Sequence, residues 1–212
     1  IGLGIPAEPL FRSRSPWYPW RNYIERITLS NGLTEIGTYA MYDLDKMDSI
    51  RWGQSLTIIR DNAFSNCDGL THLFLPESLV TIKEYAFSYC NRLKRLQMGG
   101  NVATIESMAF VPTDSLETID FGNSPTQIYS SAFAYPWWNS YKNNLISIRA
   151  KKIKSIGSYA FYNCPNLVSL QLGDSIERIE GESFYACNSL PSVHFPATLN
   201  YVEGNSFTYA YV

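Results

Sequence analysis

The sequence predicts a β-rich α/β solenoid in which short parallel strands and short helical turns stack in about eight repeated units. One observation is a β-branched residue that recurs at intervals of 23, 23, 23, 23, 28, 23 and 23 residues, at Ile36, Ile59, Ile82, Ile105, Ile128, Ile156, Ile179 and Val202. Another is a phrase that returns four times with a cysteine at the same point, as in AFSNCDGL at 63–70. Because a unit of about 23 residues cannot bury its apolar face alone, the units must stack.

Each unit divides into three segments. In one copy, residues 70–75 alternate between apolar and polar side chains, which is typical of a strand with one buried face. After a short turn, residues 79–82 predict a second short strand. Residues 63–70 place apolar side chains at i, i+1, i+4 and i+7, the spacing of a helical face, so we expect a short helical turn there.

The four cysteines occupy one position of the repeat and are expected to point inward. Other repeats place Leu44, Thr113 or Pro136 there, so the position favours modest volume rather than sulfur. We interpret Cys67, Cys90, Cys164 and Cys187 as small buried hydrophobic residues with free thiols. Neighbouring side chains would run parallel across coils, too far apart for a disulfide. Their spacing does not match a zinc framework, so we expect no metal site.

Composition and charge exclude several function classes. Apolar residues make up 45% and charged residues 17%, and the formal net charge of -2 offers no general attraction to nucleic acid. No apolar run approaches the roughly 18–20 residues that cross a bilayer, so we expect no membrane insertion. The two histidines lie about five repeats apart, and the thiols have no neighbouring base in the pattern. We therefore predict a protein that is not an enzyme and needs no cofactor.

The repeats predict one solenoid domain over residues 16–212, preceded by a tail at 1–15. Residues 16–23, PWYPWRNY, combine aromatic bulk with proline and are expected to cover the first coil as a lid. The 28-residue interval contains an insert at 134–144 with its own Pro-Trp opening. Its aromatic side chains either cover the join between two blocks of repeats or form a binding loop. In the second case Trp137, Trp138 and Tyr141 are candidate ligand contacts.

The outward positions of the first strand form the best candidate binding surface. In stacked repeats these positions line one continuous face, which is the usual binding face of repeat proteins. Four arginines and both histidines fall on it, against one carboxylate, Asp120. Arginine beside small hydroxyl residues suits hydrogen bonding to carboxylates or sugars, whereas a simple solvated sheet is the alternative. The candidate contacts are Arg26, Arg51, His72, Phe74, Arg95, Gln97, Arg149 and His194.

The repeat resembles a known family. Leu70-x-x-Leu73-x-Leu75-x-x-Ser78 is similar to the leucine-rich repeat pattern. With the 23-residue period and the S-L-x-x-I-x-x-x-A-F-x-x-C-x-x-L phrase, the chain resembles BspA-like leucine-rich repeat proteins over residues 16–212. The resemblance implies a leucine-rich-repeat solenoid on the cell surface or outside the cell, acting as an adhesion module. Its partner would be a host or cell-surface protein, or a glycan. The alternative is a structural spacer within a larger surface protein.

Overall fold

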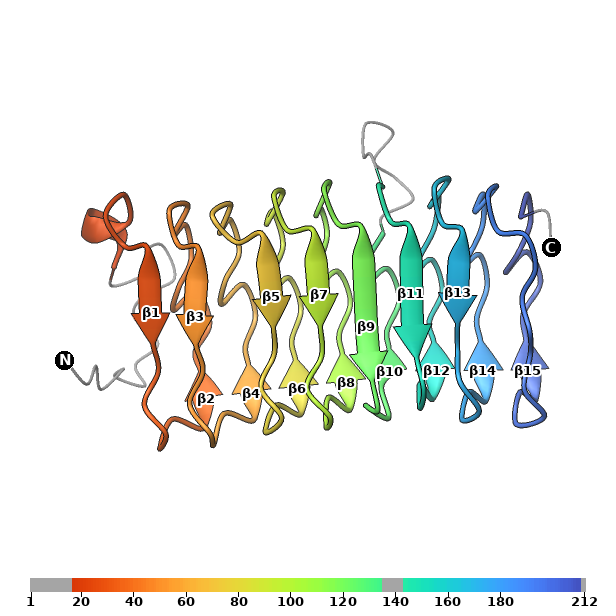
Figure 1. Ribbon diagram of the computed structural model, residues 1–212, viewed down its shortest axis with the longest axis horizontal. Helices are drawn as coiled ribbons and strands as arrows, with labels where there is room; N and C mark the ends of the chain where they lie inside the picture. The colour runs from red at the N-terminus through yellow and green to blue at the C-terminus, as the bar shows by residue number, and fades with distance from the viewer. Residues whose placement is uncertain (1–16, 135–142, 211–212) are drawn as a thin grey trace.

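The computed structural model describes residues 17–134 and 143–210, which form a solenoid with parallel sheets on two sides (Figure 1). We call one turn of it a coil. The first strands of the coils are β1 (Arg26–Thr28), β3 (Ser49–Arg51), β5 (His72–Phe74), β7 (Arg95–Gln97), β9 (Thr118–Gly122), β11 (Ser147–Ala150) and β13 (Ser169–Gln171). The second strands are β2 (Glu35–Ile36), β4 (Ile58–Ile59), β6 (Thr81–Ile82), β8 (Thr104–Ile105), β10 (Gln127–Ile128), β12 (Ser155–Ile156), β14 (Arg178–Ile179) and β15 (Tyr201–Val202).

Strand pairing confirms the repeat that the sequence predicts. The second strands form one eight-stranded parallel sheet in which each strand pairs with the same strand of the next coil. Ile82 is paired with Ile105, one period along the chain. Ile128 is paired with Ile156 across the 28-residue interval, so the insert does not change the register. Stacking is therefore continuous on this side of the solenoid.

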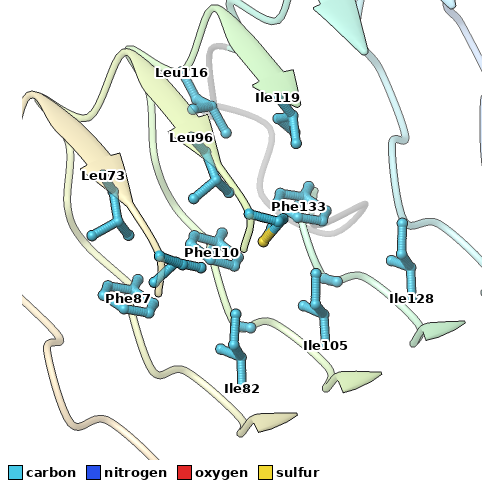
Figure 2. Close-up of a cluster of buried hydrophobic side chains, with 14 of the residues drawn as sticks. Leu73, Ile82, Phe87, Leu96, Ile105, Phe110, Leu116, Ile119, Ile128 and Phe133 are labelled. Carbon is cyan, nitrogen blue, oxygen red and sulfur yellow. The ribbon is translucent and has the colours of Figure 1, made fainter. Parts of the chain in front are cut away.

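The core consists of columns of identical positions that run along the stack. Successive phenylalanine rings of one column are stacked, with centroids 5.0–5.3 Å apart and planes within 16° of parallel. The rings are those of Phe64, Phe87, Phe110, Phe133, Phe161, Phe184 and Phe207. Figure 2 shows part of this column between Leu73, Leu96 and Ile119 of the first sheet and Ile82, Ile105 and Ile128 of the second.

The predicted short helical turns are wrong. Within the described residues the only helix is the 3-10 helix η1 (Tyr18–Trp20), and the Ala-Phe segments are consecutive tight turns. In the segment 60–70, Asn62 has φ 56 and Asn66 has φ 63. Left-handed residues four positions apart interrupt a right-handed helix, and asparagine is among the residues that tolerate this conformation best. The i, i+1, i+4, i+7 spacing therefore reflects two successive turns that point the same side chains inward.

These turns build a third ladder of hydrogen bonds between coils. The backbone N–H of Phe64 donates to the carbonyl of Ala86 at 2.8 Å, and that of Asn66 donates to Ser88 at 2.8 Å. The intervening Ser65 donates within its own coil, to Asn62 at 3.2 Å. Alternate residues thus bond to the next coil and to their own coil. The third side of the solenoid is joined by backbone bonds although it contains no strand.

The aromatic segment at 16–23 contacts the first coil with only part of its side chains. Trp17 packs against the hydrophobic core. Trp20 is 63% exposed and Tyr23 is 79% exposed, so these two rings point toward solvent. The contact of this segment with the core therefore rests on its first tryptophan.

All four cysteines are buried as free thiols, which confirms their predicted inward position. Three of them also donate a hydrogen bond, which sequence reasoning missed. Each thiol reaches the carbonyl at the phenylalanine position of the preceding coil, a group that the turns leave available. The sulfur–oxygen pairs are Cys67–Met41 at 3.2 Å, Cys90–Phe64 at 3.3 Å and Cys187–Phe161 at 3.4 Å. Where threonine replaces cysteine, the Thr113 hydroxyl donates to the Phe110 carbonyl at 2.8 Å.

We expect Cys90→Thr to be more stable than Cys90→Val by about 1 kcal/mol, because only threonine can donate to a nearby carbonyl. The two side chains match in shape, so the difference isolates the hydroxyl. Urea unfolding followed by circular dichroism measures it. Equal midpoints, or a more stable valine variant, would show that the thiol acts only as a small hydrophobic group.

Candidate functional site

The candidate sheet-face residues are exposed, as the alternation along the first strands predicts. β5 and β7 each bury their middle residue and expose the two that flank it. Phe74 is 59% exposed, which is unusual for a phenylalanine and makes it the largest apolar contact on this face. The structure places Arg26 on β1, Arg51 on β3, His72 and Phe74 on β5, Arg95 and Gln97 on β7, and Arg149 on β11.

Positive charge is neutralised at one end of this face and not at the other. Arg149 forms an ion pair with Asp120 of the neighbouring strand, with 3.6 Å between Nη1 and Oδ2. Across the described residues, Arg26, Arg51 and Arg95 take part in no ion pair. The outward residues of β1, β3, β5 and β7 include no carboxylate. The four strands therefore present three uncompensated guanidinium groups and the exposed ring of Phe74.

The face is not the continuous sheet that the sequence predicts. It comprises a two-stranded sheet, β1–β3, and a five-stranded sheet from β5 to β13. Beyond β13, residues 191–196 form no strand, and His194 is exposed in that segment. The backbone N–H of Val168 donates to Ile146 at 2.9 Å, but Pro191 stands at the equivalent position of the following coil and has no N–H to donate. The ladder therefore ends before His194.

A second interruption separates β3 from β5, and we call it the seam. Within residues 17–134 no backbone hydrogen bond joins these two strands. Figure 1 shows β3 and β5 farther apart than the other neighbouring first strands. The second sheet is unbroken at this level, because β4 pairs with both β2 and β6. The two coils thus stay stacked on one side and are spread apart on the other.

Trp52 explains the seam. It occupies the inward position that Leu29, Leu75 and Met98 fill in other coils, and those three are buried whereas Trp52 is half-buried. An indole is too large for that volume, and forcing it inward would overpack the core. Its ring lies edge-on to Phe64, with 5.7 Å between ring centroids. The oversized side chain thus lies between the coils and holds the strands apart.

The Trp52 indole also replaces a missing backbone donor. In an intact part of the sheet, the carbonyl of Gln97 accepts from the backbone N–H of Leu75 at 2.9 Å. At the seam, the equivalent carbonyl of Phe74 accepts from Trp52 Nε1 at 2.6 Å. The N–H groups of Ile50, His72 and Phe74 have no protein partner within the described residues. The sequence does carry a signal for this break, since tryptophan stands where other coils have leucine or methionine.

The structure does not bring catalytic groups together. Among the polar side chains of the described residues, His72 contacts the Thr71 hydroxyl alone, with Nδ1 3.0 Å away, and His194 lies five coils farther along. Burial raises the pKa of the Cys90 thiol to about 12, so thiolate is scarce near neutral pH. Among residues 17–134 and 143–210, no group of three metal-ligating side chains is clustered. These same residues contain no helix with the length and hydropathy that a bilayer crossing requires.

The insert is described only at its two ends, where Asn144 Nδ2 donates to the Asp114 carbonyl at 2.6 Å. Trp137, Trp138 and Tyr141 lie outside the described residues, so both interpretations of the insert stay predictions.

The sequence model of one protein family, the BspA type leucine rich repeat region, matches the chain in six copies, over residues 18–136 and 139–211. The chain belongs to this family. The resemblance that the sequence pattern predicts is therefore confirmed. Leucine-rich repeat solenoids are generally binding scaffolds rather than enzymes. No curated protein sequence matches this BspA-type chain significantly.

Solved structures share the fold of this BspA-type protein. The Treponema pallidum leucine rich repeat protein TpLRR is 24% identical, with a TM-score of 0.67 over 80% of this chain and 79% of that one. The pneumococcal vaccine antigen PcpA is 21% identical, with a TM-score of 0.56 over 87% of this chain and 54% of that one. TLR13, solved in complex with ssRNA13, is 22% identical, with a TM-score of 0.56 over 86% of this chain and 26% of that one. At these identities the likeness concerns the fold alone.

We expect the backbone amides of His72 and Phe74 to exchange with deuterium much faster than those of Arg95 and Gln97, because the first pair has no hydrogen-bond partner. The four residues occupy matched positions on neighbouring strands, which makes β7 the control for β5. Amide exchange followed by NMR measures this difference. Equal protection of the two pairs would contradict an open seam.

We expect a disulfide exchange reagent to modify no cysteine in the native protein and four after denaturation. Burial blocks access to all four thiols, and it also raises the pKa of the Cys67 thiol well above its ordinary value. Absorbance of the released chromophore at pH 8 counts the modified thiols. Rapid reaction of any cysteine in the native protein would contradict the buried column.

Proposed function

We propose that this protein is a non-enzymatic binding module of the cell surface or extracellular space. It recognises a partner through the first-sheet face, the surface formed by the outward residues of the first strands. The observation that carries the proposal is that β1, β3, β5 and β7 together expose three arginines without ion pairs and the ring of Phe74. Exposed aromatic and arginine side chains are the types that most often anchor protein interfaces. The family to which the chain belongs supports a surface role.

The charge on this face favours an acidic protein partner. Guanidinium groups bind carboxylates in a bidentate geometry, and unpaired ones on a shared surface also speed encounter with a negative surface. Serine and threonine on β1 and β3 add neutral donors beside Arg26 and Arg51. Glycans that carry carboxylates or sulfates match part of this chemistry but make less use of Phe74. We therefore favour a protein over a glycan.

The second candidate function is a structural spacer. Ion pairs such as Lys83–Glu106 and Lys154–Glu177 join neighbouring coils along the second-sheet side, and the second sheet is unbroken from end to end. Such a rod could display another domain without binding anything itself. A spacer does not need unpaired arginines on one face, so the charge distribution favours the binding module.

A ligand is first sought by binding of the wild-type chain to a panel of host matrix proteins and glycans. We expect the variant Arg26→Glu/Arg51→Glu/Arg95→Glu to bind that ligand with an affinity lower by about tenfold or more. Biolayer interferometry of the purified chain measures the loss.

The control variant is Lys46→Glu/Lys151→Glu/Lys152→Glu, which changes the net charge equally at exposed positions away from the outward residues of the sheet. Circular dichroism verifies that both variants fold. Equal effects of the two variants would indicate general charge attraction, and no binding across the whole panel would favour the spacer.

A further inference from the structure

We infer that the seam is the specific recognition site of this face, and that it takes an acidic polypeptide segment with an aromatic or aliphatic side chain among its carboxylates. This inference rests on the proposed function and narrows it to the contact between β3 and β5. Elsewhere the first sheet is closed by backbone bonds, from β5 through β13. Between β1 and β13 the seam is the one junction of neighbouring first strands that no strand pairing closes, and there both backbone groups and inward side chains are accessible.

The first argument is the set of unsatisfied backbone groups. The N–H groups of His72 and Phe74 point toward β3 and have no protein acceptor there. In a closed sheet these two groups would donate to the carbonyls of the preceding strand. A partner's carboxylate or backbone carbonyl can occupy the same position. A polypeptide supplies acceptors at the spacing of alternate strand residues, which a sugar chain does not.

The second argument is apolar surface at positions that are buried elsewhere. Ile50 and Trp52 are half-buried, whereas their counterparts in the next coil, Leu73 and Leu75, are 2% and 6% exposed. Phe74 lies across the seam from them and is 59% exposed. In the inferred complex, one apolar side chain of the partner rests on the outward Phe74 ring and reaches the inward Ile50 and Trp52 through the seam. An apolar centre with a polar rim is typical of interface hot spots.

The third argument is charge. Arg51 flanks the seam on β3, and Arg26 and Arg95 stand on the next strands to either side. None of the three has an ion-pair partner among the described residues. Carboxylates that flank the apolar residue of the partner would therefore meet a guanidinium on both sides of the seam. A neutral or basic segment would leave these charges uncompensated.

The test is a random dodecapeptide display library selected on the purified wild-type chain. We expect the enriched peptides to share Asp or Glu next to an aromatic or large aliphatic residue. Binding of synthetic copies is then measured on Trp52→Leu, in which leucine restores the side chain that neighbouring coils carry and lets the ladder close. We expect a loss of about tenfold or more. Amide exchange at His72 and Phe74 verifies closure, because their protection should rise in the variant.

Trp20→Leu is the matched control, since it removes a tryptophan that is 63% exposed outside the face. It should leave peptide affinity unchanged within about twofold. Equal binding by Trp52→Leu overturns the inference even if the arginine variant loses binding, and in that case the proposed face stands without the seam. Failure to enrich any acidic peptide, or binding confined to glycans, overturns the inferred partner. If both the arginine variant and Trp52→Leu bind the peptides as tightly as the wild-type chain, the proposed face and the seam are both overturned.

Discussion

The hydrogen bonds between successive coils are the constraint on which this solenoid depends. A 23-residue coil has no layer of its own to satisfy its backbone, and a buried N–H or carbonyl without a partner is costly. Two strand ladders and the turn ladder through Phe64 and Asn66 meet this need in every direction around the coil. Each ladder requires the same residue spacing, which explains why the period is so strict. The 28-residue interval keeps the register of the second sheet although it is longer, because Ile128 still pairs with Ile156.

The same constraint explains why two local substitutions interrupt one sheet without breaking the solenoid. Pro191 removes a single donor, and Trp52 adds volume where a leucine fits. In both coils the second sheet continues, because β4 of the Trp52 coil pairs with β6 and β15 of the Pro191 coil pairs with β14, so stacking is preserved by the remaining ladders. Redundancy among three ladders therefore allows one side to open. Of the two interruptions, the one at Trp52 lies among the strands that carry the uncompensated arginines, and the one at Pro191 lies beyond β13.

Much of this architecture could be predicted from the sequence because repetition reveals it. The period, the inward cysteines and the outward arginines all follow from comparing copies of one pattern. The turns could not be told from helices, since two tight turns with left-handed Asn62 and Asn66 give the same apolar spacing as one helical face. The thiol hydrogen bonds needed coordinates, because the acceptor belongs to another coil. The seam needed them too, since whether an indole fits depends on the volume that its neighbours leave.

An open seam is also the physically reasonable place for recognition. Closing β3 onto β5 would form backbone bonds worth about 0.5–1.5 kcal/mol each. The Trp52 indole recovers one acceptor, Phe74, and leaves the N–H groups of His72 and Phe74 to water. A partner that supplies acceptors there exchanges these water contacts for protein contacts and covers Ile50 as well. The backbone groups that form no hydrogen bond within the fold at the seam can therefore form hydrogen bonds with a partner. A closed stretch of sheet offers a partner only its outward side chains.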